Sequence, residues 1–372
     1  MLSDLEGGKM KKYDNSNTFY SQYKSIIDNK SEWFRFGNRQ LLEEVDVDTL
    51  FTPLESSNFI KMLFFYENMM GLVPKVHFPD DREVHTVSAF IMGIVLKEQL
   101  RLSVRSLPQV LDDYHQRFVF FWSVICLSHD LTFGLEYDKS IVSTCPTIDE
   151  FIKHYHFKYN LLDESQYSEL FRNYYDYRIN EHNCVDHGLT CGLMIYNVLM
   201  DDYIKNIKRK EEAVLFVGEP WKYSKDYPKQ IVKICETIAR HNIWAPTNDN
   251  ENTYIKYNLP TIDEFEHIEY SESESLLFLL GLVDTLEPIK CYRRLEEYDY
   301  NKVLKSLYIK CNNRKKSIKI FTDNVFDDKL LASWKGLENW LDVEVEVNEG
   351  RNIITISFEY EKEEKEPDSM VA

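Results

Sequence analysis

Apolar residues recur at helical spacing over most of the middle of the chain. Between residues 58 and 294 they stand three and four positions apart, and polar stretches at 138–146 and 247–260 interrupt them. This periodicity predicts one helical domain, which we place at residues 51–300. Residues 1–50 are mostly polar with scattered aromatic side chains, and we expect this N-terminal extension to pack on the body of the domain.

The pattern changes after Pro288. Three stretches alternate as strands do and one has helical spacing: strands at 317–321, 343–347 and 352–358, and a helix at 327–341. We therefore predict a mainly α fold in which the helical domain is followed by a small C-terminal α+β segment at residues 301–360. Residues 361–372 are charged and without periodicity, which is typical of a disordered acidic tail.

Composition and charge narrow the function classes. Of the 372 residues, 44% are hydrophobic and 28% are charged, as in ordinary globular proteins. Lysine and arginine number 44 against 62 aspartate and glutamate, which gives a net charge of −18. Long nucleic acid is therefore disfavoured as a partner, because binding it needs an excess of positive charge.

The sequence carries no pattern typical of export or membrane insertion. The N-terminal lysines are not followed by an apolar stretch. The longest apolar runs, 118–127 and 276–283, are shorter than the roughly 20 residues that a membrane span needs. The seven cysteines include no CxxC pair, which argues against a disulfide framework and a thiolate zinc site. We expect a cytoplasmic protein that has no membrane partner.

Several apolar helical segments carry a histidine or aspartate on the face that should be buried. The run 118–127 ends directly in the doublet His129-Asp130, and Asp284 follows the run 276–283 on a common face. The same helical period brings three further histidines to the buried faces of their segments: His85, His187 and His241. Burying such groups costs several kcal/mol unless they are paired. A divalent cation that binds all six would satisfy them together.

A single histidine on an apolar helix face is more often a satisfied core residue than a metal ligand. Five segments with the same feature make a stronger case, because five such placements should not be independent accidents. The doublet His129-Asp130 is the most informative of them, since adjacent residues can bind one ion together only where a helix ends.

With this order of residues the chain resembles the HD-domain superfamily of metal-dependent phosphohydrolases. The matching pattern is His85, His129-Asp130, His187, His241 and Asp284, and it covers more than half of the chain. The resemblance implies an HD-type helical fold in which the first ion is bound by His85, His129, Asp130 and Asp284. In members with two ions Asp130 would bridge them, and residues at the places of His187 and His241 would bind the second ion. His182 is an additional ligand or substrate contact under this interpretation.

The function that the resemblance implies is hydrolysis of a phosphoester in a nucleotide or another small phosphorylated metabolite, with a metal-activated water as nucleophile. Two divalent ions are expected, as Mn, Mg, Zn, Ni or Co. Catalytic roles are expected for Asp130, His182 and Lys290, and Asp186 and Arg293 are further candidates for contacts with substrate.

Two alternatives stay open from the sequence. Some proteins with the same ligand order use two Fe ions to activate dioxygen, as in the myo-inositol oxygenase family. A helical domain that binds a nucleotide for signalling, without catalysis, would also fit. The strands of the C-terminal segment would offer an edge for a homo-oligomer.

Overall fold

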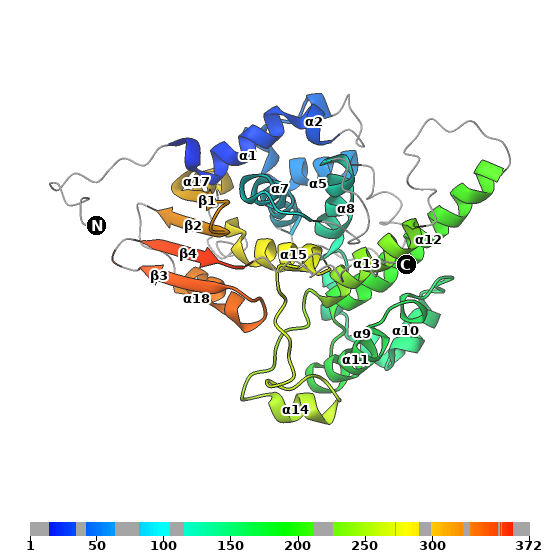
Figure 1. Cartoon of the computed structure of the whole chain (residues 1–372). Helices are drawn as coiled ribbons and strands as arrows, with labels where there is room; N and C mark the ends of the chain where they lie inside the picture. The colour runs from blue at the N-terminus through cyan, green and yellow to red at the C-terminus, as the bar shows by residue number, and fades with distance from the viewer. Residues whose placement is uncertain are drawn as a thin grey trace, which may run out of the picture.

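The computed structural model describes residues 15–34, 42–63, 82–104, 115–211, 226–271, 273–289, 299–322, 328–348, 350 and 352–359. It is mainly helical, with a small antiparallel sheet of four strands near the C-terminus (Figure 1). The predicted fold class is therefore confirmed: a mainly α chain that ends in a small α+β segment.

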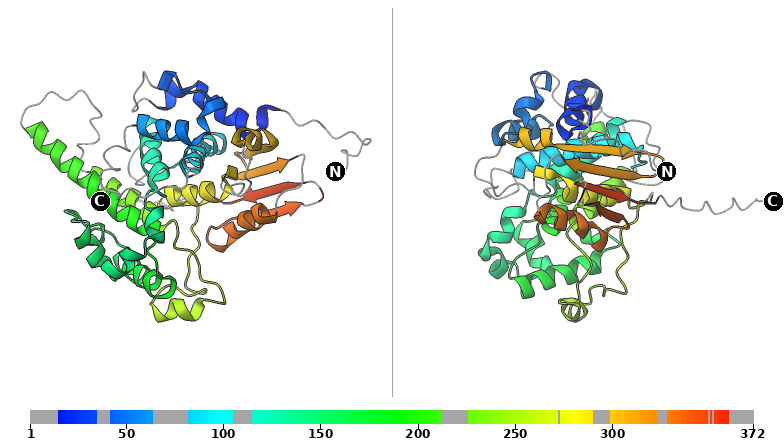
Figure 2. Two further views of the ribbon diagram at one scale, coloured as in Figure 1. Left: turned by 180° about the vertical axis from the view of Figure 1, so that it is seen from behind. Right: turned by 90° about the vertical axis from the view of Figure 1, so that its left-hand side faces the viewer.

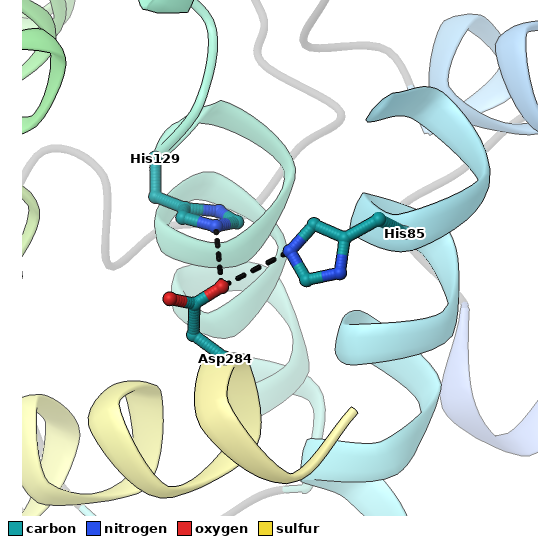
Figure 3. Close-up of side chains that lie close together, drawn as sticks. All are labelled: His85, His129 and Asp284. Atoms are coloured by element: carbon teal, nitrogen blue, oxygen red, sulfur yellow. Dashed lines mark hydrogen bonds and ion pairs between the residues drawn. The ribbon is translucent and has the colours of Figure 1, made fainter. Parts of the chain in front are cut away.

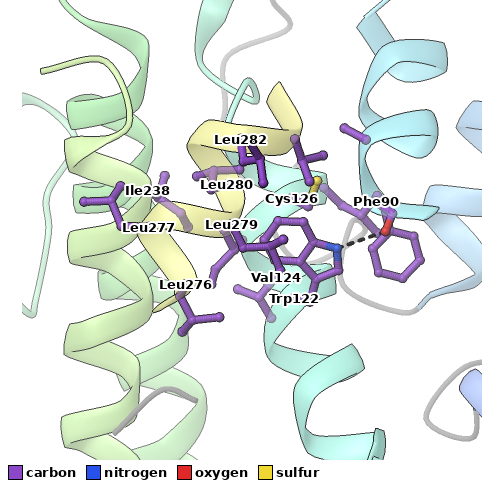
Figure 4. Close-up of a cluster of buried hydrophobic side chains, with 14 of the residues drawn as sticks. Phe90, Trp122, Val124, Cys126, Ile238, Leu276, Leu277, Leu279, Leu280 and Leu282 are labelled. Carbon is purple, nitrogen blue, oxygen red and sulfur yellow. Dashed lines mark hydrogen bonds between the residues drawn. The ribbon is translucent and has the colours of Figure 1, made fainter. Parts of the chain in front are cut away.

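The centre of the molecule is built from helices of two kinds. Those that are apolar on nearly every side are α7 (Arg82–Leu100), α8 (His115–Ser128) and α15 (Ser275–Leu286). Those that are apolar on one broad face are α12 (His187–Glu211) and α13 (Tyr227–Arg240). Every residue of α15 is buried. Around it, Trp122 of α8 packs among leucines of α15, and its indole N–H donates to the carbonyl of Phe90 at 2.9 Å (Figure 4).

Short N-terminal helices lie against this centre. They are the 3-10 turn η1 (Asn15–Asn17), α1 (Phe19–Asp28), α2 (Lys30–Trp33), α4 (Val47–Leu50) and α5 (Pro53–Met62). Phe19 and Tyr23 on one face of α1 are fully buried. Since α1 and α5 both contact α7, the N-terminal residues that the structure describes belong to the same core as the helical body.

A further group of helices lies in the lower part of Figure 1, where α9, α10, α11 and α14 are labelled. It contains η2 (Phe133–Tyr137), α9 (Lys139–Thr144), α10 (Ile148–His154), η3 (Leu161–Asp163), α11 (Ser168–His182) and α14 (Glu251–Lys256). Helices α9 and α14 lie in stretches that the sequence pattern marks as loops. Local caps account for α9, because Asp138 accepts a hydrogen bond from the amide of Ser140 and starts the helix.

The C-terminal segment forms one antiparallel sheet in the order β1-β2-β4-β3. Its elements are α17 (Tyr300–Ser306), β1 (Leu307–Asn312), β2 (Ser317–Thr322), α18 (Asp328–Lys335), η5 (Gly336–Asn339), β3 (Glu344–Asn348) and β4 (Ile353–Ser357). The sequence pattern predicts β2, β3, β4 and α18 but not α17 or β1. The acidic tail at 361–372 lies outside the described residues.

The sheet lies beside the helical body in both views of Figure 2, and contacts that the sequence pattern does not predict join the two. The amide of Ile268 donates to the carbonyl of Trp340 at 2.8 Å, and the amide of Asp342 donates back to Ile268 at 3.0 Å. The buried ring of Trp340 fills the space beside Gly281, where an added Cβ would approach it to 2.4 Å. The helices and the sheet therefore share one hydrophobic core.

Among the described residues, the 20-residue stretch Phe118–Tyr137 is long and apolar enough to span a membrane. It is longer than the apolar run seen in the sequence because the buried residues continue past the end of α8. Since 94% of its most apolar window is buried inside the fold, we assign it to the protein core.

Candidate metal centre

The structure brings together all six residues that the sequence pattern selects. His85 lies on α7, and His129 and Asp130 directly follow α8. His187 is the first residue of α12, His241 directly follows α13, and Asp284 lies on α15. All six side chains are buried, and none of these residues is more than 8% exposed. Helix ends thus carry four of the six into the core, where the backbone leaves the helical path.

Three ligand atoms, from His85, His129 and Asp284, lie close to the spacing of one coordination sphere, and an oxygen of Asp130 lies somewhat farther out. Nε2 of His85 lies 3.0 Å from Oδ1 of Asp284, and Nε2 of His129 lies 3.5 Å from the same oxygen (Figure 3). Oδ2 of Asp130 lies 3.7 Å from Nε2 of His129 and 3.9 Å from Nε2 of His85. With bonds of about 2.0–2.2 Å, ligands of one ion lie about 3.0–3.6 Å apart. Small side-chain shifts would therefore place all four around a cation.

The other ring nitrogen of each imidazole is anchored by an acceptor. Nδ1 of His129 donates to the carbonyl of Cys126 at 2.7 Å, and Nδ1 of His241 donates to that of Ile238 at 2.6 Å. Nδ1 of His85 lies 2.8 Å from Oε2 of Glu287. A carbonyl can only accept, so Nδ1 of His129 and His241 carries a proton and Nε2 faces the cluster. This is the orientation in which a neutral imidazole binds metal through Nε2.

Two of these ring nitrogens point into the cluster without a hydrogen bond. Nε2 of His129 and Nε2 of His241 are buried and have no hydrogen-bond partner among the described residues. Buried polar atoms almost always have a partner. Together with the buried carboxylates of Asp130 and Asp284, they form groups that could hold a metal ion, so the donor set fits a divalent cation.

Asp130 faces the cluster on two sides. Its Oδ2 belongs to the sphere described above, and its Oδ1 lies 3.1 Å from Nε2 of His187. The rings of His187 and His241 are 5.2 Å apart. The side-chain nitrogen Nδ2 of Asn242 lies 2.9 Å from Nε2 of His187. This side chain therefore occupies the space in which His187 would bind a second ion.

Charges around Asp130 keep it ionised. Burial alone would raise its pKa, but His129, Arg82 and His187 outweigh burial and hold the pKa of this carboxyl well below its usual range. The Arg82 guanidinium donates to Oδ2 of Asp130 and stacks 3.6 Å from the ring centre of Phe133. The carboxylate therefore stays ionised near neutral pH, and Arg82 already donates to the oxygen that faces His85 and His129.

The histidines of the cluster differ sharply in their affinity for a proton. Burial would lower the pKa of His187, but its contacts with Asp130 and Glu136 raise it to about 10. The pKa of His241 falls to about 3 because of burial and the neighbouring rings of His129 and His187. The two acids thus favour a positive charge at His187, which an ion bound there would have to displace as a proton, whereas His241 stays neutral.

Glu136 and Asp186 form a further group of buried or half-buried acids beside His187. Oε1 of Glu136 lies 2.8 Å from Nδ1 of His187 and accepts from the backbone amide of the same residue at 3.1 Å. Asp186, fully buried beside it, accepts from the amide of Leu189 at 2.9 Å and so caps α12. Burial raises the pKa of Asp186. We interpret Glu136 as the group that orients His187, because its oxygen is already occupied by these donors.

Of the predicted catalytic residues outside the ligand set, the structure describes only His182. His182, the last residue of α11, is exposed, and its Nε2 lies 2.8 Å from the hydroxyl of Tyr177. Within the described part of the chain, no hydrogen bond or ion pair links His182 to the six ligands. Lys290 and Arg293 lie outside the described residues.

The sequence analysis missed three residues of the centre: Arg82, Glu136 and Glu287. Helical spacing could have found two of them, because Arg82 stands three positions before His85 and Glu287 three positions after Asp284. Glu136 gives no such signal. It comes from the turn η2 and meets His187 only through the tertiary fold.

Comparisons with protein-family models, with curated proteins and with solved structures found no match to this chain.

Proposed function

We propose that the protein is a metal-dependent phosphohydrolase that acts on a nucleotide or another small phosphorylated metabolite. One observation carries the proposal: the buried Nε2 atoms of His129 and His241 meet the ionised carboxylate of Asp130 without a hydrogen bond of their own. The resemblance of the ligand order to the HD-domain superfamily supports the choice of reaction.

His85, His129, Asp130 and Asp284 would bind the first ion. We propose a second ion between Oδ1 of Asp130, His187 and His241, with Asp130 as the bridge. Divalent ions in such a site lower the pKa of a bound water and neutralise charge on phosphoryl oxygens. The imidazole ligands suit zinc, nickel, cobalt or iron, whereas the carboxylate ligands also suit manganese and magnesium.

Arg82 is the described cation best placed to contact a phosphate. It is only 8% exposed, and its Nε has no hydrogen-bond partner among the described residues. A small hollow borders it, lined by Ile60, Arg82, Glu83, Thr86, Leu127, Asp130 and Leu131. A guanidinium in this place can donate to a phosphoryl oxygen while the stacked Phe133 ring keeps it oriented.

The first test is the metal content of the protein, purified without chelator, by mass spectrometry. Wild type is compared with Asp130→Ala, His187→Ala and the control His154→Ala, which removes an exposed histidine of α10. We expect metal in wild type and the control and its loss in Asp130→Ala. A screen of nucleotides and phosphorylated metabolites for phosphate release then follows.

Each other outcome has a definite meaning. Two irons per chain and no phosphatase activity would replace the proposal by a di-iron oxygenase. Metal in wild type without turnover of any phosphoester, but with tight nucleotide binding, would favour a signalling protein. Absence of metal from every sample, even after incubation with manganese, would refute the metal centre.

A further inference from the structure

A second carboxylate lies directly behind the metal centre. Glu287 follows the last residue of α15, one turn beyond Asp284, and is fully buried. Its Oε2 lies 2.8 Å from Nδ1 of His85. Its Oε1 accepts from the hydroxyl of Ser88 at 2.5 Å and from the backbone amide of Ile289 at 2.9 Å. One side chain thus joins two residues of α7 to the segment that follows α15.

The hydrogen bonds that Glu287 accepts determine how it acts on His85. The amide of Ile289 can only donate, and the Ser88 hydroxyl donates to the same oxygen, so Oε1 is an acceptor on both contacts. The ring nitrogen Nδ1 of His85 can therefore donate to Oε2 of Glu287, and Nε2 is the ring nitrogen that faces Asp284 in the metal centre.

The chain of hydrogen bonds continues to the N-terminal helix. The hydroxyl of Tyr23 lies 3.2 Å from Oγ of Ser88, and either atom could donate by distance alone. Because Ser88 has one proton and Glu287 receives it, Tyr23 must donate to Ser88. The direction of the whole series is then fixed: Tyr23 to Ser88, Ser88 to Glu287, and His85 to Glu287. Tyr23, Ser88, His85 and Glu287 are each fully buried.

We propose that Glu287 is a positioning residue, supported by Ser88 and Tyr23, that fixes the metal-binding tautomer of His85. This inference rests on the metal centre proposed above. Glutamine cannot replace Glu287, because its amide has one acceptor oxygen and one donor group. With the oxygen toward Ile289, the NH₂ group faces Nδ1 of His85 and drives the ring proton to Nε2. With the oxygen toward His85, the NH₂ group of the glutamine faces two other donors, the Ser88 hydroxyl and the Ile289 amide.

The chain contains a matched control for this substitution. Glu236 on α13 is also a buried glutamate that accepts from a serine hydroxyl, that of Ser165, at 2.7 Å. The structure shows no contact of Glu236 with the six ligands among the described residues. Glu236→Gln therefore makes the same chemical change in a similar setting without reaching His85.

The experiment is a titration of metal-free protein with Zn²⁺ in competition with a chromophoric chelator, beside urea denaturation of the same samples. We expect Glu287→Gln to weaken zinc binding by about 10- to 100-fold and Glu236→Gln to leave it near wild type. Equal affinity of wild type and Glu287→Gln would overturn the inference and leave the metal centre standing. Equal losses in both variants would also overturn it, because the effect would then be one of general stability.

Failure of the proposed centre looks different, because wild type itself would then bind no zinc. Should Glu287→Gln not fold, Ser88→Ala and Tyr23→Phe test the same series. We expect weaker zinc binding in both, with the larger loss in Ser88→Ala, which removes the donor next to Glu287. Wild-type affinity in both would overturn the inference. ¹⁵N spectra of histidine-labelled, zinc-loaded protein give an independent readout, because they report whether Nδ1 of His85 carries the proton.

Discussion

Substituting Gly188 by alanine should displace His241 from the metal centre while the protein stays folded. An added Cβ at Gly188 would lie 2.7 Å from Cε1 of His241, 2.8 Å from Nδ1, and 3.0 Å from the carbonyl of Ile238. Ordinary contact begins at 3.4 Å, so the ring must move by 3.4 − 2.7 = 0.7 Å. The ring cannot move freely, since its Nδ1 is bonded to the same carbonyl at 2.6 Å.

The expected cost has two parts. Overpacking of this kind costs about 1–3 kcal/mol, and replacing a helical glycine by alanine returns up to about 1 kcal/mol. We therefore expect a net loss of roughly 0–2 kcal/mol in the free energy of unfolding of the metal-free protein. The loss in metal binding should be larger, because a shift of this size removes Nε2 of His241 from bonding distance.

Gly192 supplies the control. It lies one turn further along α12, and an added Cβ would meet the carbonyl of Cys235 at 2.7 Å and Cβ of Ala239 at 2.8 Å. The packing between α12 and α13 is disturbed to a similar degree, but no histidine is involved. Urea denaturation and metal content by mass spectrometry should show similar destabilisation in both variants and loss of metal only in Gly188→Ala. Full metal content in a folded Gly188→Ala protein would refute the assignment of His241 as a ligand.

Two further predictions concern charge and metal. Burial would raise the pKa of Glu274, but Arg240 and Lys233 lower it below its usual 4.5. The stability that ionised Glu274 contributes is therefore present above pH 4.5 and is lost as the pH falls through the pKa of the folded state. Glu274→Gln should therefore cost about 1.5–3 kcal/mol at pH 7 and flatten the acid side of the stability curve in urea denaturation, whereas an unchanged acid side would contradict this assignment. Removing metal with EDTA should lower the free energy of unfolding by about 2.7 kcal/mol when the free ion had been at 100 times its Kd, and Asp130→Ala should show no such response.

Sequence periodicity was sufficient to select the six buried side chains of the candidate centre. His85, His187 and His241 each continue an apolar helical face, and a polar side chain in that place must meet a partner inside the fold. The same reasoning predicted the mainly helical body and three of the four strands. These features are local, because they depend on the period of one helix or strand at a time.

The sequence did not reveal partners that arrive from distant segments. Glu136 comes from a 3-10 turn with no periodicity, and Trp340 of the C-terminal segment packs on Gly281 across the fold. Strand β1 was missed for a similar reason: Leu307 to Ile309 are buried in succession because α1 and α7 cover them, so the strand does not alternate along its length.

The sequence by itself determined which side chains turn inward and that their buried charges must be compensated. Only the tertiary structure decided how they are compensated: Asp130 meets His129, Arg82 and His187, and His85 meets Asp284 on one side and Glu287 on the other. The reason is physical. Helical period fixes the direction of a side chain within its own element, whereas the distance between two ligand atoms depends on how separate helices pack.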